Sequence, residues 1–199
     1  MHILIATPLY PPDIAGHAPY VKELARRLSP EHTVTVVLYS SFPEVVVGVH
    51  LIGISKQQPA LLRLFNFTKT LYTCARKADI ILVQNGQSVE LGMVFTKMFL
   101  WKKPFILNVY DSGAFTYTNM LSSILLRIAL KCASRVWTYT NTDPFIPAPV
   151  SKKMMPGILP KPEILPFEPY PTDMLLQYEK AWEVHLSELN TQCYALCKK

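Results

Sequence analysis

The chain has 199 residues, of which 50% are hydrophobic and 17% are charged, and its formal net charge is +6. This length suffices for one substantial core with an appendage, and no uncharged apolar run of about 18 residues is present to span a bilayer. The basic residues are dispersed without an RNA-binding signature, so nucleic acid is not an expected partner. An anionic membrane surface or a phosphorylated substrate fits the charge at least as well.

The amino terminus and the cysteines indicate the compartment. Met1 to Ile5 lacks a basic leader and predicts a strand, not a signal peptide, so we expect a cytoplasmic protein. Cys74 and Cys132 lie in apolar helical patterns and are expected to be core thiols. Cys193 and Cys197 are one helical turn apart without a nearby His, so no metal site is expected.

Segments with strand-like and helix-like patterns alternate along the chain, which predicts parallel βαβ units. The predicted strands are 2–7, 33–39, 45–54 with a break near Gly48, 79–84, 104–110 and 135–140. The predicted helices are 17–28, 60–77, 88–101 and 119–132. The buried face of the second helix is expected to carry Leu61, Leu64, Phe65, Leu71, Tyr72 and Ala75. The expected fold class is α/β, with a Rossmann-like parallel sheet flanked by helices.

The pattern changes after the last predicted strand. Residues 144–171 contain nine of the 17 prolines, which predicts an extended strap without regular structure. Residues 172–197 then predict a long amphipathic helix whose apolar stripe is Leu175, Tyr178, Trp182, Leu186 and Leu189. The predicted organisation is a Rossmann-like domain over 1–141, a Pro-rich linker over 142–171 and the helix over 172–199.

Ligands of open parallel sheets bind beyond the carboxyl ends of the strands. This rule selects polar residues and glycines that follow the first, fourth, fifth and sixth predicted strands. They are Tyr10, Asp13, Gly16 and His17, then Asn85 and Gly86, then Asp111, Ser112 and Gly113, then Asn141 and Asp143. His17 can cap a helix or reach a substrate, and Asn85 can bond an acceptor or the turn backbone.

The first loop and its helix, TPLYPPDIAGHAPYVKELARRL, resemble the start of family-4-type glycosyltransferases with the GT-B fold. In that family a Y-P-P-D-x-G-G-like loop precedes a helix with an E-L-A-like stretch. Tyr10 to Asp13 and Gly16 match, whereas Ala15 replaces the first of two glycines. In the family this loop approaches the phosphates of the donor and the acceptor. Gly16 permits close backbone approach, and the following helix N-terminus offers N–H groups to an anion.

A second segment, ADIILVQNGQSVELGMVFTKMFLWKKPFILNVYDSGAF, is similar to the family's strand, helix and K-P-F/V strand that ends near an Asp or His. The resemblance implies that Asp111 orients an acceptor hydroxyl or takes its proton, or that Ser112 occupies the family's polar position after a one-residue slip. A helix N-cap or a turn is the structural alternative for Asp111.

The resemblance covers residues 1–141 and implies a single GT-B N-terminal half, the half that binds the acceptor. The implied function is sugar transfer from a nucleotide-sugar co-substrate to a glycan or lipid-linked acceptor, with no other cofactor and a donor-binding domain from a partner. The alternative is a non-catalytic or truncated binding module.

Two further expectations concern surfaces. Arg63/Phe67/Lys69 and Trp101-Lys102-Lys103 fit either a peripheral membrane contact or an ordinary solvated rim. In GT-B enzymes the last helix commonly packs on the N-terminal domain, so we expect the helix over 172–197 to dock there with Trp182 near the centre.

Overall fold

The computed structural model describes residues 1–13, 18–109, 120–138 and 172–198. Six parallel strands form one sheet in the order β3-β2-β1-β4-β5-β6, which is the order of a Rossmann fold. The strands are β1 (His2–Thr7), β2 (Thr33–Leu38), β3 (Val49–Gly53), β4 (Ile80–Gln84), β5 (Phe105–Val109) and β6 (Arg135–Thr138). Every residue of β4 and β5 is buried, as their nearly continuous apolar sequences predict for strands covered on both faces.

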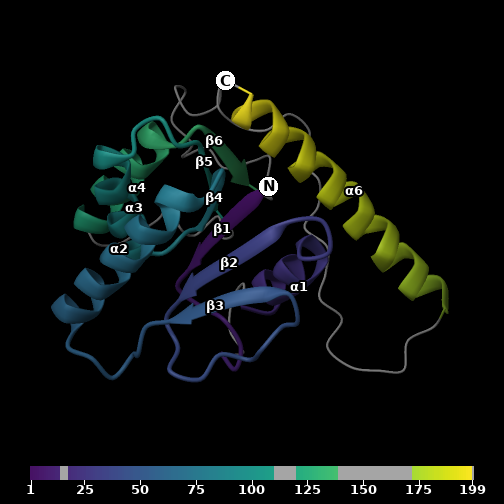
Figure 1. Ribbon diagram of the computed structural model, residues 1–199, viewed down its shortest axis with the longest axis horizontal. Coiled ribbons are helices and arrows are strands. Elements are labelled where there is room, and N and C mark those ends of the chain that lie inside the picture. Colours follow the sequence, from purple (N-terminus) through teal and green to yellow (C-terminus); the bar gives the residue numbers. More distant parts are fainter. Residues whose placement is uncertain (14–17, 110–119, 139–171, 199) are drawn as a thin grey trace.

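Helices cover both faces of the sheet (Figure 1). α1 (Ala18–Leu28) and α6 (Thr172–Cys197) pack on one face, whereas α2 (Ala60–Lys77), α3 (Gln87–Phe99) and α4 (Met120–Cys132) pack on the other. Each face has its own hydrophobic cluster because side chains of a strand alternate between the two sides. The predicted fold class is therefore confirmed as a three-layer α/β arrangement with a parallel sheet at its centre.

The helix predicted over 172–197 is present and docks on the α1 side of the sheet, as expected. Trp182, Leu189 and Cys193 are fully buried there. Leu175 is wrong as a member of the buried stripe, because residues 174–177 of α6 are exposed. Cys193, which no core prediction included, is the fully buried thiol, while Cys74 and Cys132 pack at the margin of the other cluster.

The predicted buried face of α2 is partly wrong. The helix meets the sheet along a narrow stripe of Phe67, Leu71 and Ala75, whereas Leu61 and Phe65 point away from the core and are exposed. Since Phe67 is fully buried, it cannot belong to a membrane-contacting group with its neighbours in sequence. The third strand starts only after the predicted break, at Val49.

The predicted Pro-rich linker lies outside the described residues. Its range, 142–171, falls entirely within 139–171, so the three-part division of the chain stays a prediction. Among the described residues, none of the helices combines the length and the apolar character needed to cross a membrane.

Candidate functional site

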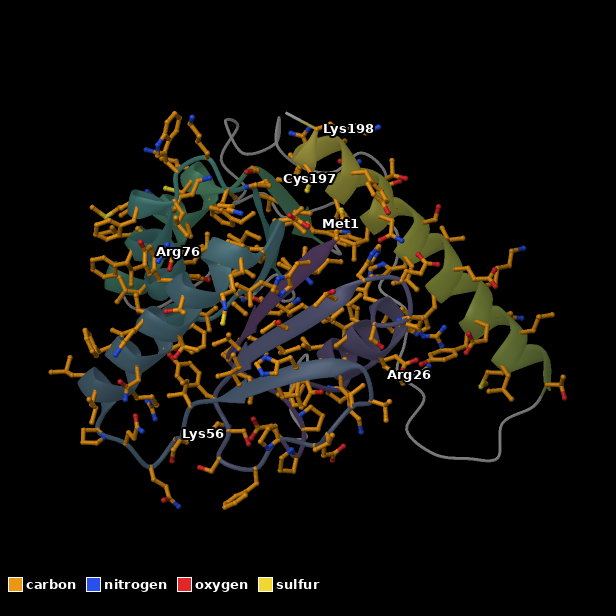
Figure 2. The ribbon with its side chains drawn as sticks, viewed as in Figure 1. Met1, Arg26, Lys56, Arg76, Cys197 and Lys198 are labelled. Carbon is orange, nitrogen blue, oxygen red and sulfur yellow. The ribbon has the colours of Figure 1, made fainter. Side chains whose placement is uncertain are left out.

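The strand order reverses between β1 and β4, which both lie at the centre of the sheet. The connection after β1 leads to α1 on one face, and the connection after β4 leads to α3 on the other face. Loops that leave a sheet in opposite directions open a crevice between them, and this is where open α/β sheets bind ligands. The candidate site is therefore the carboxyl edge of β1 and β4, at the end of the sheet marked by Lys56 and opposite to Met1 and Cys197 in Figure 2.

The loop after β1 is held by its own polar groups. The Thr7 hydroxyl donates to the Leu9 carbonyl at 2.7 Å and accepts from the Leu9 N–H at 3.3 Å. A turn follows in which the Asp13 N–H donates to the Tyr10 carbonyl at 3.0 Å, and the peptide bond between Pro11 and Pro12 is cis. The hydrogen bonds fix the direction in which the loop leaves the sheet.

Tyr10 is fully buried beneath this loop, in the cluster on the α1 side of the sheet. Burial, helped by the negative charge of Glu44, raises the pKa of the Tyr10 phenol to about 12, so the ring stays neutral. In this arrangement Tyr10 anchors the loop from below. Its role in substrate binding stays a prediction.

Asp13 forms an ion pair with Lys56, which follows β3. The Lys56 ammonium lies 2.7 Å and 2.6 Å from the two carboxylate oxygens of Asp13, and one of these oxygens also accepts from the Tyr10 N–H at 3.4 Å. Both side chains are partly exposed at the carboxyl edge. The pair ties the β1 loop to the β3 loop and places a carboxylate and a cation side by side at this edge of the sheet.

The ends of β4 and β5 carry two buried amides that the sequence analysis did not select. The Asn108 side-chain N–H donates to the Gln84 side-chain oxygen at 2.9 Å, and the Asn85 N–H donates to the Asn108 carbonyl at 2.9 Å. Both residues could have been selected from the sequence, because each is a polar residue near the end of an otherwise apolar strand. These bonds hold Asn85, which is half-buried, at the edge of the crevice.

Gly86 brings the β4 loop against the β1 loop. A Cβ atom on Gly86 would lie 2.8 Å from the Pro8 Cγ atom, which is closer than real side chains approach. The two loops that carry Tyr10, Asp13 and Asn85 are therefore in contact, and the sequence-based prediction that these residues share one edge of the sheet agrees with their positions.

Glu90, in the first turn of α3, is a second polar group that the rule about strand ends does not select. It is fully buried, and its Oε1 atom accepts the Gly86 N–H at 3.2 Å, while Oε2 has no hydrogen-bond partner among the described residues. Burial raises the pKa of the Glu90 carboxyl to about 7. A carboxyl group that changes charge near neutral pH therefore lies directly behind the β4 loop.

A polar cleft of about 590 Å³ lies beside this edge, between the ends of β2 and β3 and the flank of α2. Its polar lining consists of hydroxyl, amide and ammonium groups: Ser41, Ser55, Gln58, Asn66, Lys69, Thr70 and Thr73. Ser41 donates to Ser55 at 2.9 Å, and Asn66 donates to Gln58 at 2.9 Å. This volume is in the range of small-molecule sites, and the lining suits a ligand rich in hydroxyl groups.

The remaining predicted site residues lie outside the described residues: Gly16, His17, Asp111, Ser112, Gly113, Asn141 and Asp143. Asp111 follows β5 by two positions in sequence, so its assignment stays a prediction. Within 1–13, 18–109, 120–138 and 172–198, no group of three or more His, Cys, Asp or Glu side chains is placed to hold a metal ion.

The fold defined by this sheet is the Rossmann-like half of a GT-B structure, and solved structures with the same fold exist. No protein-family model and no curated protein matches the sequence. The chain is similar to HepE from Anabaena in complex with UDP-glucose, with a TM-score of 0.57, 15% identity, and coverage of 90% of this chain and 49% of HepE.

It is also similar to a UDP-GlcNAc 2-epimerase from Neisseria meningitidis bound to UDP-GlcNAc, with a TM-score of 0.53 and 18% identity over 77% of this chain and 45% of the epimerase. At these identities the likeness concerns the fold alone. The chain spans about half the length of the solved structures that it resembles.

Proposed function

We propose that the chain is the acceptor-side domain of a family-4-type glycosyltransferase, which takes part in sugar transfer from a nucleotide sugar to a glycan or lipid-linked acceptor. The observation that carries this proposal is the contact between the β1 and β4 loops at the strand-order reversal, where the Asp13–Lys56 pair lies beside a polar cleft. A carboxylate and an ammonium group next to hydroxyls and amides suit a polyhydroxylated or phosphorylated acceptor.

The donor side of the reaction is assigned to a separate domain. The two similar solved structures contain UDP-sugars and are about twice as long as this chain. We therefore assign nucleotide binding to a second domain, either on another chain or elsewhere in a longer protein. The proposed location of the protein is the cytoplasmic side of a membrane, where a lipid-linked acceptor would be available.

In the proposed reaction Asp111 orients the acceptor hydroxyl or takes its proton, and Asp13 with Lys56 positions the acceptor beside it. Tyr10, Gly16, His17, Asn85 and Ser112 complete the proposed acceptor-side site. Asp13 is already neutralised by Lys56, so its carboxylate suits hydrogen bonding to hydroxyl groups better than proton abstraction.

The test has two parts. In calorimetric titrations of the chain alone with UDP-glucose and UDP-GlcNAc, we expect dissociation constants weaker than about 10 μM, because the proposal assigns nucleotide binding to a second domain. In ligand-observed NMR with monosaccharides, disaccharides and undecaprenyl phosphate, we expect at least one acceptor-like ligand to bind.

Asp13→Asn should weaken that acceptor binding, whereas the matched variant Asp79→Asn should not, because Asp79 precedes β4 at the opposite edge of the sheet. Tight UDP-sugar binding by the chain alone would contradict the assignment of the donor site to another domain. Equal binding by both variants would contradict the acceptor site. Binding without transfer, once a donor domain is supplied, would favour the non-catalytic binding module.

A further inference from the structure

The outer side of the α2 and α3 layer carries a group of large apolar side chains that face away from the core. We call this group the α2–α3 face; its members are Leu61, Phe65, Phe95, Met98, Phe99 and Trp101. Leu61 is 83% exposed, and Phe99 and Trp101 are each 70% exposed. Single exposed apolar residues are ordinary, but a contiguous group of this size marks an interaction surface.

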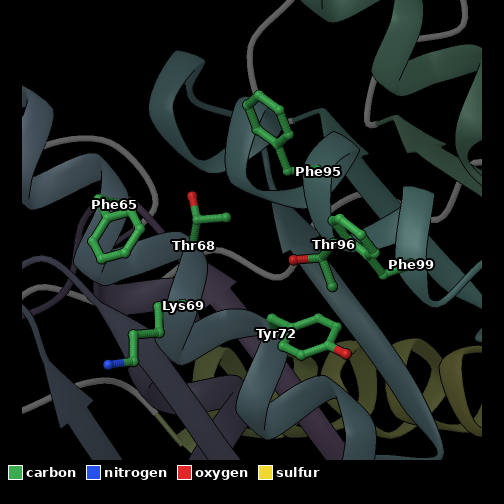
Figure 3. A pocket seen from close by; sticks show the side chains of 7 residues that line it. All are labelled: Phe65, Thr68, Lys69, Tyr72, Phe95, Thr96 and Phe99. Atoms are coloured by element: carbon green, nitrogen blue, oxygen red, sulfur yellow. The ribbon is translucent and has the colours of Figure 1, made fainter.

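Three of these side chains, Phe65, Phe95 and Phe99, line one groove. A hollow of about 340 Å³ runs between α2 and α3, and Phe65, Tyr72, Phe95 and Phe99 supply its aromatic walls. Figure 3 shows the rings of Tyr72 and Phe99 on facing helices, and their centroids are 6.0 Å apart. Phe65, Phe95 and Phe99 therefore form one apolar surface across two helices, and Leu61, Met98 and Trp101 are further exposed apolar residues of the same helical layer.

Basic side chains border this surface. Lys69 lines the groove with its aliphatic chain, while its ammonium points away from Phe95 and Phe99 (Figure 3). The Lys102 ammonium lies 5.3 Å from the centre of the Trp101 ring. Along α2, residues 61, 65, 69, 72 and 76 recur every three or four positions, so Leu, Phe, Lys, Tyr and Arg share one outward stripe.

The segment that contains α2 and α3 is predominantly basic. Residues 60–109 contain seven lysines and arginines but only two acidic residues, Asp79 and Glu90. Glu90 is fully buried, and Asp79 lies at the start of β4, where it accepts the His2 N–H at 2.8 Å. The surface thus offers exposed aromatic rings within a positive field that exposed acidic groups do little to offset.

We propose that the α2–α3 face docks on an anionic lipid bilayer, with the aromatic side chains inserted between headgroups and with Lys69, Arg76 and Lys102 bound to lipid phosphates. Aromatic rings with polar tips and long basic side chains are the residues that favour a membrane–water interface. A protein partner with a basic surface would be repelled by the same charges, whereas lipid phosphates complement them. This proposal is independent of sugar transfer.

Trp101 makes the proposal directly measurable. The chain has three tryptophans, of which Trp137 and Trp182 are buried, so Trp101 alone is exposed among them. On addition of phosphatidylcholine vesicles with about 30% phosphatidylglycerol, we expect a blue shift of tryptophan emission and quenching by brominated acyl chains. Pure phosphatidylcholine vesicles, or salt raised to about 500 mM, should weaken the binding because the lysines and arginines then lose their counter-charges or are screened.

Variants at exposed positions provide the controls. Phe65→Ser with Phe99→Ser should reduce vesicle affinity by about tenfold or more, since two rings lose their apolar burial. Phe42→Ser with Val47→Ser removes two apolar residues that are even more exposed, from the loop between β2 and β3, and should leave vesicle binding unchanged. Both double variants should keep the melting temperature of the parent.

Three outcomes would overturn the proposal. One is the absence of binding to anionic vesicles by the parent chain. Another is equal binding by the Phe65/Phe99 and Phe42/Val47 double variants. The third is a dimer in sedimentation velocity without lipid that the Phe65/Phe99 variant abolishes, because the α2–α3 face would then join two copies of the chain. Failure of these tests leaves the acceptor-site experiments unaffected, since those are read by NMR and calorimetry.

Discussion

The hydroxyl of Tyr20 in α1 and the Nε2 atom of His185 in α6 form a buried hydrogen bond of 2.8 Å across 165 residues of sequence. Trp182 stacks on Tyr20 with ring centroids 5.7 Å apart, and Trp137 of β6 stacks on His185 at 4.5 Å. α1, α6 and the sheet therefore meet in one aromatic cluster. The expectation that the last helix docks with Trp182 near the centre is confirmed by this cluster.

Trp182→Ala should destabilise the protein strongly. Its side chain is fully buried between α1 and the sheet, and truncation of a buried Trp costs about 3–5 kcal/mol through lost burial and the cavity left behind. Thermal unfolding should show a fall of roughly 10 °C in melting temperature. Leu176→Ala on the exposed first turns of the same helix is the control and should melt like the parent. Equal melting temperatures for the two variants would mean that α6 is not docked in solution.

Arg27→Ala should cost more stability than Glu179→Ala, although the two residues form one ion pair. The Arg27 guanidinium lies 5.0 Å from the Trp182 ring and 5.5 Å from the Tyr178 ring, and its side chain is largely buried. Glu179 is half-exposed, and exposed ion pairs contribute at most about 1 kcal/mol. Urea unfolding should give about 2 kcal/mol for Arg27→Ala, since aliphatic packing and the cation–π contact are both lost.

Arg27→Met separates packing from charge. It keeps an unbranched chain over the two rings, so it should recover part of the stability lost in Arg27→Ala. If Glu179→Ala costs as much as Arg27→Ala, the pairing itself and not the packing is the dominant contribution.

Glu90→Gln should change how stability depends on pH. The carboxyl has a folded-state pKa of about 7 against an ordinary value of 4.5, so the folded protein binds a proton that the unfolded chain has already released between these values. Stability of the parent should therefore fall as pH rises from about 4.5 to about 7 and then level off. The glutamine variant lacks this loss and should gain up to about 3 kcal/mol relative to the parent between about pH 5 and pH 8.

Guanidinium unfolding of the parent and of Glu90→Gln at about pH 5 and about pH 8 measures this difference in stability. The exposed Glu31→Gln variant is the control. A parallel pH dependence of parent and Glu90→Gln would mean that Glu90 is solvated in the native protein.

Gly86→Ala should strain the contact between the two loops of the candidate site. The added methyl group would lie 2.8 Å from Pro8 Cγ and 3.1 Å from Pro8 Cβ, so one loop must move. Overpacking of this kind costs about 1–3 kcal/mol. Pro8→Ala removes the Cγ atom, and Gly86→Ala should cost less in that background. A double-mutant cycle by thermal unfolding measures the coupling, and zero coupling would contradict the contact.

The sequence predicted the order and type of the elements well because their apolar patterns are strong. The continuous apolar runs of β4 and β5 and the 3.6-residue period of α1 leave few alternatives. The buried face of α2 was harder to predict, since the helix has large apolar residues on two sides. Periodicity alone cannot decide whether Phe65 or Phe67 faces the sheet, and the tertiary arrangement selects Phe67.

For the candidate site, the carboxyl-edge rule correctly grouped Asp13 and Asn85, because it depends only on the positions of strand ends. It could not find Glu90, which belongs to a helix and acquires its raised pKa only from three-dimensional burial. The ion pair of Asp13 with Lys56 could not be predicted from the sequence either. The two residues are 43 positions apart and meet only because β1 and β3 flank β2 in the folded sheet.

The placement of α6 has a consequence for the time course of synthesis. The ribosome completes all six strands before it reaches residue 172, so β1 and α1 emerge long before the helix that covers them. Until α6 follows, Tyr20 and the neighbouring apolar residues on that side of the sheet lack their covering layer. A nascent chain paused after β6 should therefore be a target for chaperones that bind exposed apolar surface, and release of the last helix should end that binding.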